Sequence, residues 1–475
     1  MRKTKIICTL GPASDDENTL EQLLKSGMNI ARLNFSHGTH EEHAEKIARF
    51  REVRDRLGVP AAVMLDTKGP EIRLRDFKNG SAIIENGAEY TLTTEDVLGD
   101  STRATVSYAD LPCQLLPGNR LLIDDGRVVL EVLDTTDTEV HTRVINGGKL
   151  SNHKGVNVPN VPLDMVYLSE DDKQDLLFGI KQDVDFIAAS FARRAQDIID
   201  MRKFLDYNGA HDIRIIAKIE NIEGIENFDD ILSHADGIMV ARGDMGVEIA
   251  YERLPGLQKR FIRRCYQSGK MVITATQMLE SMVNSPSPTR AEITDVANAV
   301  FDGTSAVMLS GESAMGKYPV LATQVMARIA EQAEYDAFDM GTYRRFEYDL
   351  DKETTNAISD AACTTARDIH AKAIIAVTKS GQTARSMSKF RPKEPIVAAT
   401  PEKKTFHQLA LSWGVYPVLA RYQNTSDDLF QHAIDCAKQI DVVEDGDLVV
   451  IGAGIPLNTS GSTNTLRVAT VGHRV

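Results

Sequence analysis

Short apolar runs rich in β-branched residues alternate with amphipathic helical patterns through the first two-thirds of the chain. Eight such runs are expected to form strands: Lys3–Leu10, Met28–Asn34, Ala61–Asp66, Val184–Ser190, Ile213–Ile219, Gly237–Val240, Met271–Thr276 and Ala306–Leu309. Most consecutive runs are separated by one segment with the 3.6-residue periodicity of a helix. Because eight β-then-α units are the count of a parallel (β/α)8 barrel, the pattern predicts a TIM barrel.

The helix expected after the first strand has its own start and stop signals. The spacing Ser14-x-x-Glu17 is that of a capping box, in which two side chains satisfy free backbone N–H groups at a helix start. Gly27 suits the left-handed conformation at which helices often end. We therefore expect a helix that Ser14 caps and that stops at Gly27.

The connection between the third and fourth strands is far longer than the others and has a different texture. It shows short alternating strands and tight turns, with Asp125-Gly126 between two such strands as a strong hairpin signal. We predict that residues 70–167 form an inserted small β-barrel domain. An insertion after a barrel strand leaves from the carboxyl face, where active sites lie, so this domain could act as a lid that excludes water.

A second α/β pattern follows a polar stretch near Met340–Glu353. Its expected strands are Ala373–Thr378, Pro395–Thr400, Val415–Ala420, Asp447–Ile451 and Thr465–Val471. This pattern predicts a small doubly wound α/β domain. The chain is therefore expected to be an α/β protein with a catalytic barrel over residues 1–69 and 168–345, a lid over 70–167 and a C-terminal regulatory domain over 346–475.

Composition limits the classes of partner. The 475 residues are 42% apolar and 26% charged, which is typical of a globular protein of two or three domains. The net charge of −14 argues against nucleic acid or an anionic membrane as the main partner, although focused cationic side chains or a bound cation can still attract phosphate ligands. The five cysteines form no C-x-x-C pair, so no disulfide framework or zinc site is indicated. No apolar stretch approaches the roughly 18 residues of a spanning helix, and the expected location is the cytoplasm.

Charged side chains gather at the carboxyl ends of the predicted barrel strands, where this fold places its chemistry. Glu220 and Asp244 follow neighbouring strands, and two carboxylates with open positions between them suit a hard divalent cation. Lys218 precedes Glu220 by two residues, so both side chains face the same side of their strand. A lysine beside a metal places positive charge against a transferring phosphoryl group, and Arg32 and Arg73 can fork onto phosphate.

Each of these residues also has a purely structural interpretation. A single arginine or glutamate at a strand end is commonly a solvated surface residue, Lys218 and Glu220 could form a structural ion pair, and Asp244 could be a turn residue. The gathering of such groups at several strand ends on one face favours the catalytic interpretation.

Seven long segments resemble the signature segments of the pyruvate kinase family. They are Arg32–Gly38, Leu65–Arg73, Ile238–Asp244, Ile273–Met282, Pro288–Glu292, Asp295–Val300 and Met308–Glu312. The resemblance runs nearly end to end and includes the family's domain order of barrel, inserted β-domain and C-terminal α/β domain. It implies an enzyme that transfers the phosphoryl group of phosphoenolpyruvate to ADP, giving pyruvate and ATP in the last step of glycolysis, and it suggests a homotetramer.

The resemblance also implies roles for residues at the reacting groups. Glu220 and Asp244 match the ligands of Mg²⁺ (or Mn²⁺), and Lys218 matches the lysine that stabilises the phosphoryl group in flight. Further matches are Arg32 as a contact to the substrate phosphate, Thr276 beside the enolate carbon, Ser310 in the polar network implicated in protonation, and Gly243 with Asp244 as backbone contacts to the substrate carboxylate.

The nucleotide and a monovalent cation have counterparts in the sequence as well. Residues matching nucleotide contacts are Asn34, Phe35, Ser36, His37, Arg73 and, on the inserted domain, Lys154. Residues matching potassium ligands are Asn34, Ser36, Asp66 and the carbonyl of Thr67. Glu71 matches the glutamate that accompanies potassium dependence, whereas members with lysine there do without potassium. The resemblance therefore implies dependence on K⁺.

A candidate effector site lies in the C-terminal part. Ser380-Gly381-Gln382-Thr383 stands between a strand and a helix, where anions bind, and it resembles the family's effector phosphate loop. A simple helix cap is the structural alternative. Members that bind a sugar bisphosphate commonly place Trp and Arg in a late loop, and Ala453–Thr463 contains neither. This favours a sugar monophosphate or a nucleotide monophosphate over fructose 1,6-bisphosphate.

Two other function classes fit parts of the pattern. Magnesium-dependent barrel lyases that act on pyruvate or oxaloacetate also use a Glu and an Asp, but they lack the inserted β-domain and the Arg32–His37 segment. A non-catalytic metabolite sensor could keep the fold, but the presence of Lys218, Glu220, Asp244 and Thr276 argues against it.

Overall fold

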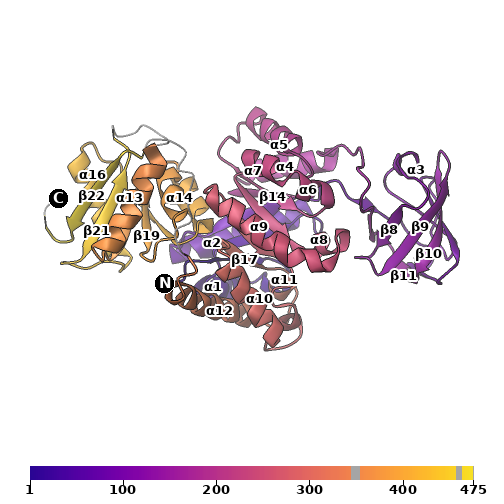
Figure 1. The fold of residues 1–475 in the computed structure, drawn as a ribbon, viewed down its shortest axis with the longest axis horizontal. Coiled ribbons are helices and arrows are strands. Elements are labelled where there is room, and N and C mark those ends of the chain that lie inside the picture. Colours follow the sequence, from indigo (N-terminus) through magenta and orange to yellow (C-terminus); the bar gives the residue numbers. More distant parts are fainter. Residues whose placement is uncertain (344–353, 456–462, 474–475) are drawn as a thin grey trace.

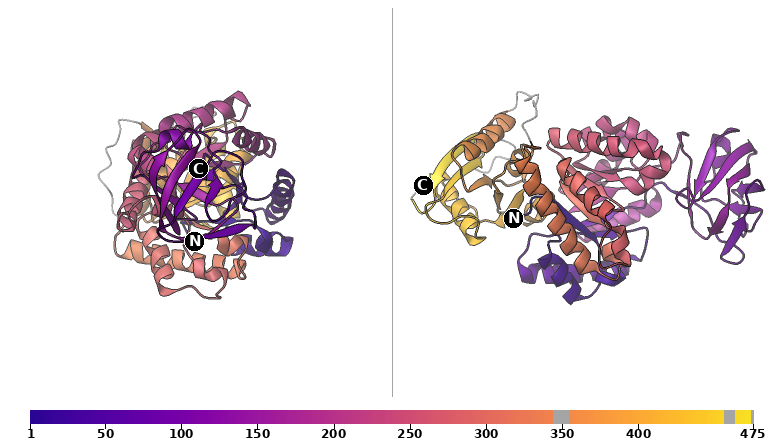
Figure 2. Two further views of the ribbon diagram at one scale, coloured as in Figure 1. Left: turned by 90° about the vertical axis from the view of Figure 1, so that its right-hand side faces the viewer. Right: turned by 60° about the horizontal axis from the view of Figure 1, so that its bottom comes forward.

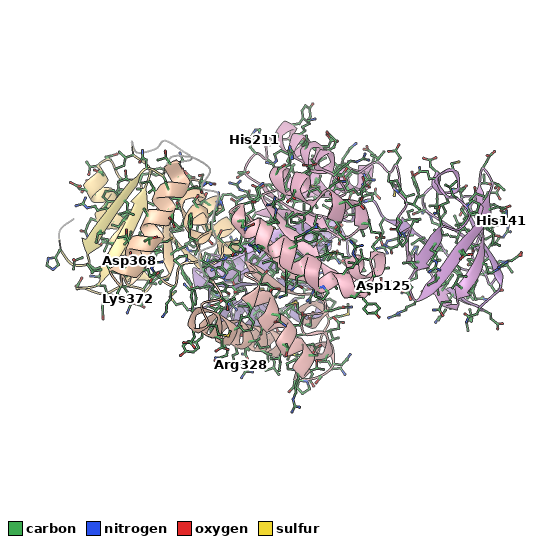
Figure 3. The ribbon with its side chains drawn as sticks, in the orientation of Figure 1. Asp125, His141, His211, Arg328, Asp368 and Lys372 are labelled. Atoms are coloured by element: carbon green, nitrogen blue, oxygen red, sulfur yellow. The ribbon has the colours of Figure 1, made fainter. Side chains whose placement is uncertain are left out.

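Three units lie in a row along the long axis of the molecule in the computed structural model, which describes residues 1–343, 354–455 and 463–473 (Figure 1). The barrel is in the middle, with the inserted domain at one end and the C-terminal domain at the other, and the turned views agree (Figure 2). His141 marks the inserted end, while Asp368 and Lys372 mark the opposite end (Figure 3). Most of the predicted polar stretch near Met340–Glu353 lies outside the described residues.

Eight parallel strands close into a barrel in the order β1-β17-β16-β15-β14-β13-β3-β2. Their bounds are β1 Lys5–Thr9, β2 Ile30–Asn34, β3 Ala62–Asp66, β13 Phe186–Ala189, β14 Arg214–Ile219, β15 Gly237–Ala241, β16 Met271–Ala275 and β17 Ala306–Leu309. Nearly every strand position is buried, because side chains point either into the barrel or against the surrounding helices. The predicted (β/α)8 barrel is confirmed.

Helices cover the outside of the barrel with their apolar faces. Their bounds are α1 Glu17–Lys25, α2 His40–Leu57, α4 Glu170–Lys181, α5 Ala195–Tyr207, α6 Ile222–Glu226, α7 Phe228–His234, α8 Arg242–Glu248, α9 Leu254–Gln267, α10 Arg290–Phe301, α11 Gly311–Ala314 and α12 Pro319–Asp339. None of the helices in the described part of the chain is both long enough and apolar enough to cross a membrane.

The start of α1 differs from the prediction. Ser14 lies in a short 3₁₀ turn over Pro12–Ser14, and its hydroxyl bonds the N–H and the carbonyl of Gly11 at 3.1 and 3.3 Å. The helix cap is Asp16, whose carboxylate accepts a hydrogen bond from the backbone of Thr19 at 2.9 Å. The prediction that Ser14 caps this helix is wrong, because the serine hydroxyl is already used within the turn that Pro12 begins.

The inserted domain is a β-domain whose main sheet nearly closes on itself. Seven strands follow the order β4-β12-β8-β9-β10-β6-β7, and a bridge between Leu74 and Val106 joins the two edges. The predicted hairpin around Asp125-Gly126 is confirmed, since β8 and β9 pair antiparallel. The elements are β4 Ile72–Arg73, β5 Ser81–Ile84, β6 Glu89–Thr93, β7 Arg103–Thr105, α3 Leu111–Gln114, β8 Arg120–Ile123, β9 Val128–Thr135, β10 Glu139–Asn146, β11 Gly148–Ser151 and β12 Gly155–Asn157.

The inserted domain meets the carboxyl face of the barrel, because the chain enters it directly after β3. Asn157 of β12 donates a hydrogen bond to Glu248 of α8 at 3.1 Å. A cavity of about 300 Å³ remains between the two units, and residues of both line it, including Glu71 and Phe191. The inserted domain therefore stands over the strand ends on which the polar side chains gather.

The C-terminal domain has a five-stranded sheet in the order β20-β19-β18-β21-β22, with only β22 antiparallel. Separate apolar clusters fill its two faces, so helices cover both sides and the doubly wound prediction is confirmed. The elements are α13 Thr354–Asp368, β18 Ala373–Val377, α14 Gln382–Ser388, β19 Ile396–Thr400, α15 Lys403–Gln408, β20 Val415–Leu419, α16 Ser426–Gln439, β21 Leu448–Ala453 and β22 Thr465–Thr470.

The beginning of the chain holds the base of the barrel against the C-terminal domain. The Lys5 ammonium donates to the carbonyl of Val415 at 2.6 Å, and burial lowers the pKa of Lys5 to about 7. Lys3 lies 5.4 Å from the ring centroid of Trp413, an indole that is only 1% exposed. These contacts place the C-terminal domain on the face of the barrel opposite the inserted domain.

Candidate active site

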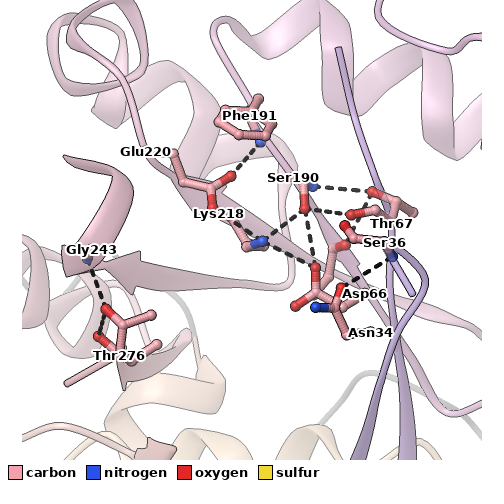
Figure 4. Close-up of polar contacts among 12 residues, drawn as sticks. Asn34, Ser36, Asp66, Thr67, Ser190, Phe191, Lys218, Glu220, Gly243 and Thr276 are labelled. Atoms are coloured by element: carbon pink, nitrogen blue, oxygen red, sulfur yellow. Dashed lines mark hydrogen bonds and ion pairs between the residues drawn. The ribbon is translucent and has the colours of Figure 1, made fainter. Parts of the chain in front are cut away.

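The Lys218 ammonium lies at the centre of a buried polar group at the carboxyl end of the barrel (Figure 4). Its side chain projects from β14, is 8% exposed as a residue, and contacts Asp66 at 3.0 Å, Ser190 at 2.7 Å and Glu220 at 3.0 Å. These partners follow β3, β13 and β14, whose carboxyl ends meet on one face of the barrel. Groups far apart in the sequence therefore converge on one ammonium.

Asp66 holds a second cation beside the first. Its Oδ2 accepts a hydrogen bond from Arg32 Nε at 2.6 Å, while its Oδ1 accepts from Lys218. Arg32 also donates to the hydroxyl of Thr9 at 2.9 Å. The two positive groups are thereby fixed in place by one fully buried carboxylate, although they would otherwise repel each other.

Negative charge exceeds positive charge among these residues. Burial by itself lowers the pKa of Lys218, but the carboxylates of Asp66 and Glu220 outweigh burial and raise that pKa, so the ammonium stays charged. Burial raises the pKa of Glu220 to about 7, with Asp244 adding to the rise and Lys218 opposing it. Two cations, Lys218 and Arg32, thus face three carboxylates. A divalent cation would offset the excess negative charge and favour ionised Glu220.

The donor set around Glu220 suits a cation with open coordination positions. One carboxylate oxygen contacts Lys218 and the other accepts the N–H of Phe191 at 2.6 Å. Among residues 1–343, 354–455 and 463–473, no group of three or more His, Cys, Asp or Glu side chains is arranged to hold a metal. A divalent cation held by the two carboxylates of Glu220 and Asp244 would leave positions for substrate and water, which Mg²⁺ commonly keeps among its ligands.

Thr276 and Gly243 join the ends of β16 and β15. The Thr276 hydroxyl accepts a hydrogen bond from the Gly243 N–H at 2.8 Å and donates to the carbonyl of Ala275 at 2.6 Å (Figure 4). Gly243 and Asp244 lie in the first turn of α8, directly after β15. The Thr276 side chain thus joins Thr276, the predicted neighbour of the enolate carbon, to Gly243, a predicted contact of the substrate carboxylate.

The predicted potassium ligands lie together at the ends of β2 and β3. Asn34 and Asp66 are register partners, and Asn34 Oδ1 accepts the N–H of Ser36 at 3.2 Å. The Thr67 carbonyl accepts the Ser190 hydroxyl at 2.6 Å. Side-chain and backbone oxygens are the ligands that a hard monovalent cation requires, so the residues present fit such an ion.

Glu71, the residue predicted to accompany potassium dependence, follows this group on the way into the inserted domain. It forms an ion pair with Arg73 at 2.7 Å. Burial raises the pKa of Glu71, although Arg73 opposes the shift.

The predicted nucleotide residues are divided between the barrel and the inserted domain. Lys154 forms an ion pair with Asp124 of the same inserted domain at 2.7 Å. Phe35 is 3% exposed and its ring stacks on His43 with centroids 4.1 Å apart, so its side chain belongs to the core. His37 is exposed on the barrel side.

Ser310, at the end of β17, is held through its backbone. Its N–H donates to Glu312 at 2.8 Å, and the same buried carboxylate accepts the N–H of Leu279 at 3.0 Å. Glu312 therefore ties the loop after β16 to the loop after β17 and sets the place of Ser310 relative to Thr276.

Comparison with known proteins identifies the family of the chain. Two family models match the chain, "Pyruvate kinase, barrel domain" over residues 1–323 and "Pyruvate kinase, alpha/beta domain" over residues 356–469. The chain belongs to the pyruvate kinase family. The resemblance seen in the sequence is thereby confirmed.

Curated pyruvate kinases resemble the whole chain. The pyruvate kinase of Clostridium acetobutylicum is 48% identical, over 99% of this chain and 100% of its own length. Those of Staphylococcus haemolyticus and Geobacillus stearothermophilus are 49% and 48% identical, over 100% and 98% of this chain and 81% and 80% of their own lengths.

The candidate effector loop of this pyruvate kinase family member joins β18 to α14. Gly381 has a positive φ of 83° and donates its N–H to the Thr378 hydroxyl at 2.9 Å. The Thr383 hydroxyl lies 2.8 Å from that of Thr463. Residues 456–462 of the late loop, over which the absence of Trp and Arg was noted, lie outside the described residues.

Sequence reasoning missed two groups that contact the centre of the site. Ser190 bonds Lys218, Asp66 and Thr67, and the backbone N–H of Phe191 bonds Glu220. Ser190 is the last residue of the fourth predicted strand, and this position at a carboxyl strand end is the feature of the sequence that points to it. The Phe191 contact has no side-chain signature, because it is made by the main chain in a left-handed conformation with φ of 52°.

Proposed function

We propose that the chain transfers the phosphoryl group of phosphoenolpyruvate to ADP, giving pyruvate and ATP, with Mg²⁺ (or Mn²⁺) held by Glu220 and Asp244. The observation that carries this proposal is the buried Lys218 ammonium, which is fixed between Asp66, Ser190 and Glu220 at the carboxyl face of the barrel. Phosphoryl transfer needs little covalent chemistry from a protein and depends on positioning and fixed positive charge, which this arrangement supplies.

The roles of the side chains follow from their places. Lys218 and Arg32 face the oxygens of the transferring phosphoryl group, and Asp66 keeps both from reorganising as charge moves. Glu220 and Asp244 would hold the divalent cation, which would supply further positive charge to the transferring group and to the enolate. The backbone of Gly243 and Asp244, in the first turn of α8, is expected to contact the substrate carboxylate. Thr276 and Ser310 belong to the polar network that leads a proton to the enolate carbon.

ADP is expected between the barrel and the inserted domain. Its phosphates would contact the Asn34–His37 segment of the barrel on one side and Arg73 and Lys154 of the inserted domain on the other. The hydrogen bond of 3.1 Å between Asn157 and Glu248 supports contact between the two units, and closing them together excludes water from the transfer.

The experiment that tests this function follows pyruvate formation from phosphoenolpyruvate and ADP with Mg²⁺, with and without K⁺. We expect turnover to require both ions, since Asn34, Ser36, Asp66 and Thr67 offer oxygen atoms of the kind that K⁺ requires. No turnover from folded protein under any combination of ions and effectors would refute the proposed function, and full activity without K⁺ would refute the potassium site alone.

A matched variant, Glu71→Lys, sharpens the potassium test. An ammonium at this position would replace the charge of the monovalent cation, so we expect the variant to keep activity in potassium-free buffer. An unchanged requirement for K⁺ in Glu71→Lys would mean that this side chain does not set the dependence.

Regulation and assembly extend the proposal. We expect a cytoplasmic homotetramer and a phosphorylated effector bound at Ser380, Gly381, Gln382 and Thr383. Activity at low phosphoenolpyruvate should rise with a sugar monophosphate or a nucleotide monophosphate and not with fructose 1,6-bisphosphate. A titration in which no phosphate compound changes activity would leave this loop with a structural role only.

A further inference from the structure

The turn that carries Thr276 has a strained backbone. Thr276 and the following Gln277 have φ values of 68° and 54°, in the left-handed region that few residues other than glycine adopt. For a β-branched residue this conformation is a marked outlier. Such a conformation persists only where the surroundings hold it, and it is concentrated at functional sites.

One side chain makes several of the contacts that stabilise this turn. Arg242, the first residue of α8, is 8% exposed and reaches across to the end of β16. Its Nε donates to the carbonyl of Ala275 at 3.2 Å, and its Nη2 donates to the carbonyl of Thr276 at 2.6 Å. The same Nη2 lies 2.8 Å from the sulfur of Met278. The guanidinium thus contacts the chain before, at and after the strained turn.

Side chains of α9 and α10 in turn hold the guanidinium of Arg242. Its Nη1 forms an ion pair with Asp295 of α10 at 2.7 Å and lies 3.4 Å from Gln258 of α9. Gln258 in turn donates to Asp302 at 3.3 Å. The planar fork of arginine can satisfy the two carbonyls and the carboxylate at once, whereas an ammonium on a flexible stem cannot. The geometry therefore uses a property specific to arginine.

The position of Arg242 in the chain connects the strained turn to the expected substrate contacts. Arg242 directly precedes Gly243 and Asp244, the expected contacts to the substrate carboxylate and the metal, and the Gly243 N–H bonds the Thr276 hydroxyl at 2.8 Å. One residue therefore sets the distance between the groups that bind the substrate and the group beside its enolate carbon.

We propose that Arg242 is a positioning residue that fixes Thr276 for proton transfer at the enolate carbon, an inference that rests on the proposed function. In the reverse direction the C3–H bond of pyruvate breaks, its electron pair forms the enolate double bond, and the proton leaves to solvent through the polar network. Loss of the guanidinium fork should therefore impair this proton transfer more than it impairs phosphoryl transfer.

The test measures the two steps separately in Arg242→Lys and Arg242→Gln. Proton transfer is followed as exchange of the pyruvate methyl protons in D₂O with Mg²⁺, K⁺ and inorganic phosphate, and phosphoryl transfer as ATP formation. We expect exchange to fall by about ten- to a hundred-fold, since a misplacement near 1 Å can cost that much, and ATP formation to fall less. Arg264→Gln, which removes an exposed arginine paired with Asp229, is the matched control and should change neither rate.

A purely structural role would give a different result. If Arg242 only stabilises the fold, both rates in both variants will fall by the same factor, in step with the loss of folded protein seen in thermal unfolding. Equal losses, or no loss in either rate, would overturn the proposal. Wild-type protein without ATP formation would instead refute the proposed function, so the two failures are distinguishable.

Discussion

Lys218→Met is expected to lower kcat for pyruvate formation by about 10³-fold, because under the proposed function it removes a fixed positive charge that faces the transferring phosphoryl group. A second effect adds to the loss. Lys218 opposes the rise in the pKa of Glu220, which burial already brings to about 7, so without the ammonium that pKa rises further. A higher pKa favours the protonated form of Glu220, and the proton competes with Mg²⁺ for the carboxylate.

The fold should survive this substitution. Methionine fills the space of the lysine stem, and Arg32 still pairs with Asp66 at 2.6 Å. Circular dichroism and thermal unfolding measured beside the kinetics would establish this. Lys203→Met, which changes an exposed lysine of α5, is the control and should keep full activity. Turnover of Lys218→Met within two-fold of wild type would remove Lys218 from the central role assigned to it.

Glu220→Gln is expected to lower kcat by a similar factor of about 10³ and to raise the Mg²⁺ concentration needed for half-maximal activity at least ten-fold. The amide keeps the shape of the side chain and can still accept the Phe191 N–H, but it no longer offers a charged oxygen to the metal. Because the negative charge is lost, Lys218 also has one counter-ion fewer, with Asp66 remaining at 3.0 Å.

Titrations of activity with Mg²⁺ and with Mn²⁺ measure this effect, and direct Mn²⁺ binding separates lost affinity from lost turnover. Glu252→Gln, at an exposed position, is the matched control. A Glu220→Gln protein with the wild-type metal requirement would show that the cation binds elsewhere.

The barrel could be predicted because its strands carry local signals. Strands buried on both faces are short and mostly apolar, and such runs recur from Lys5–Thr9 to Ala306–Leu309 with helical patterns between them. The placement of Lys218 and Glu220 on one face could also be predicted from a local signal, because residues two apart on a strand point to the same side. The predicted cap of α1 was wrong because the Ser14 hydroxyl can bond either within the turn that begins at Pro12 or at the start of a helix. The sequence alone does not distinguish these two local hydrogen bonds.

Other parts of the site depend on convergence in space. Ser190 bonds Asp66 of the neighbouring strand β3, 124 positions away in the sequence, and Arg242 reaches Ala275 and Asp295, which are 33 and 53 positions away. No periodicity or spacing encodes which side chain will meet which carbonyl at that range. The pairing of Lys154 with Asp124 within the inserted domain is of the same kind.

The position of Trp413 makes the joint between the barrel and the C-terminal domain optically visible. It is the single tryptophan of the chain, and it lies between the Lys3 ammonium and the Arg391 guanidinium, which is 4.5 Å from its ring centroid. Indole emission depends on nearby charge and on water, so light absorbed by this one side chain reports on that joint alone. A movement at this joint can therefore be followed by fluorescence without attaching a dye.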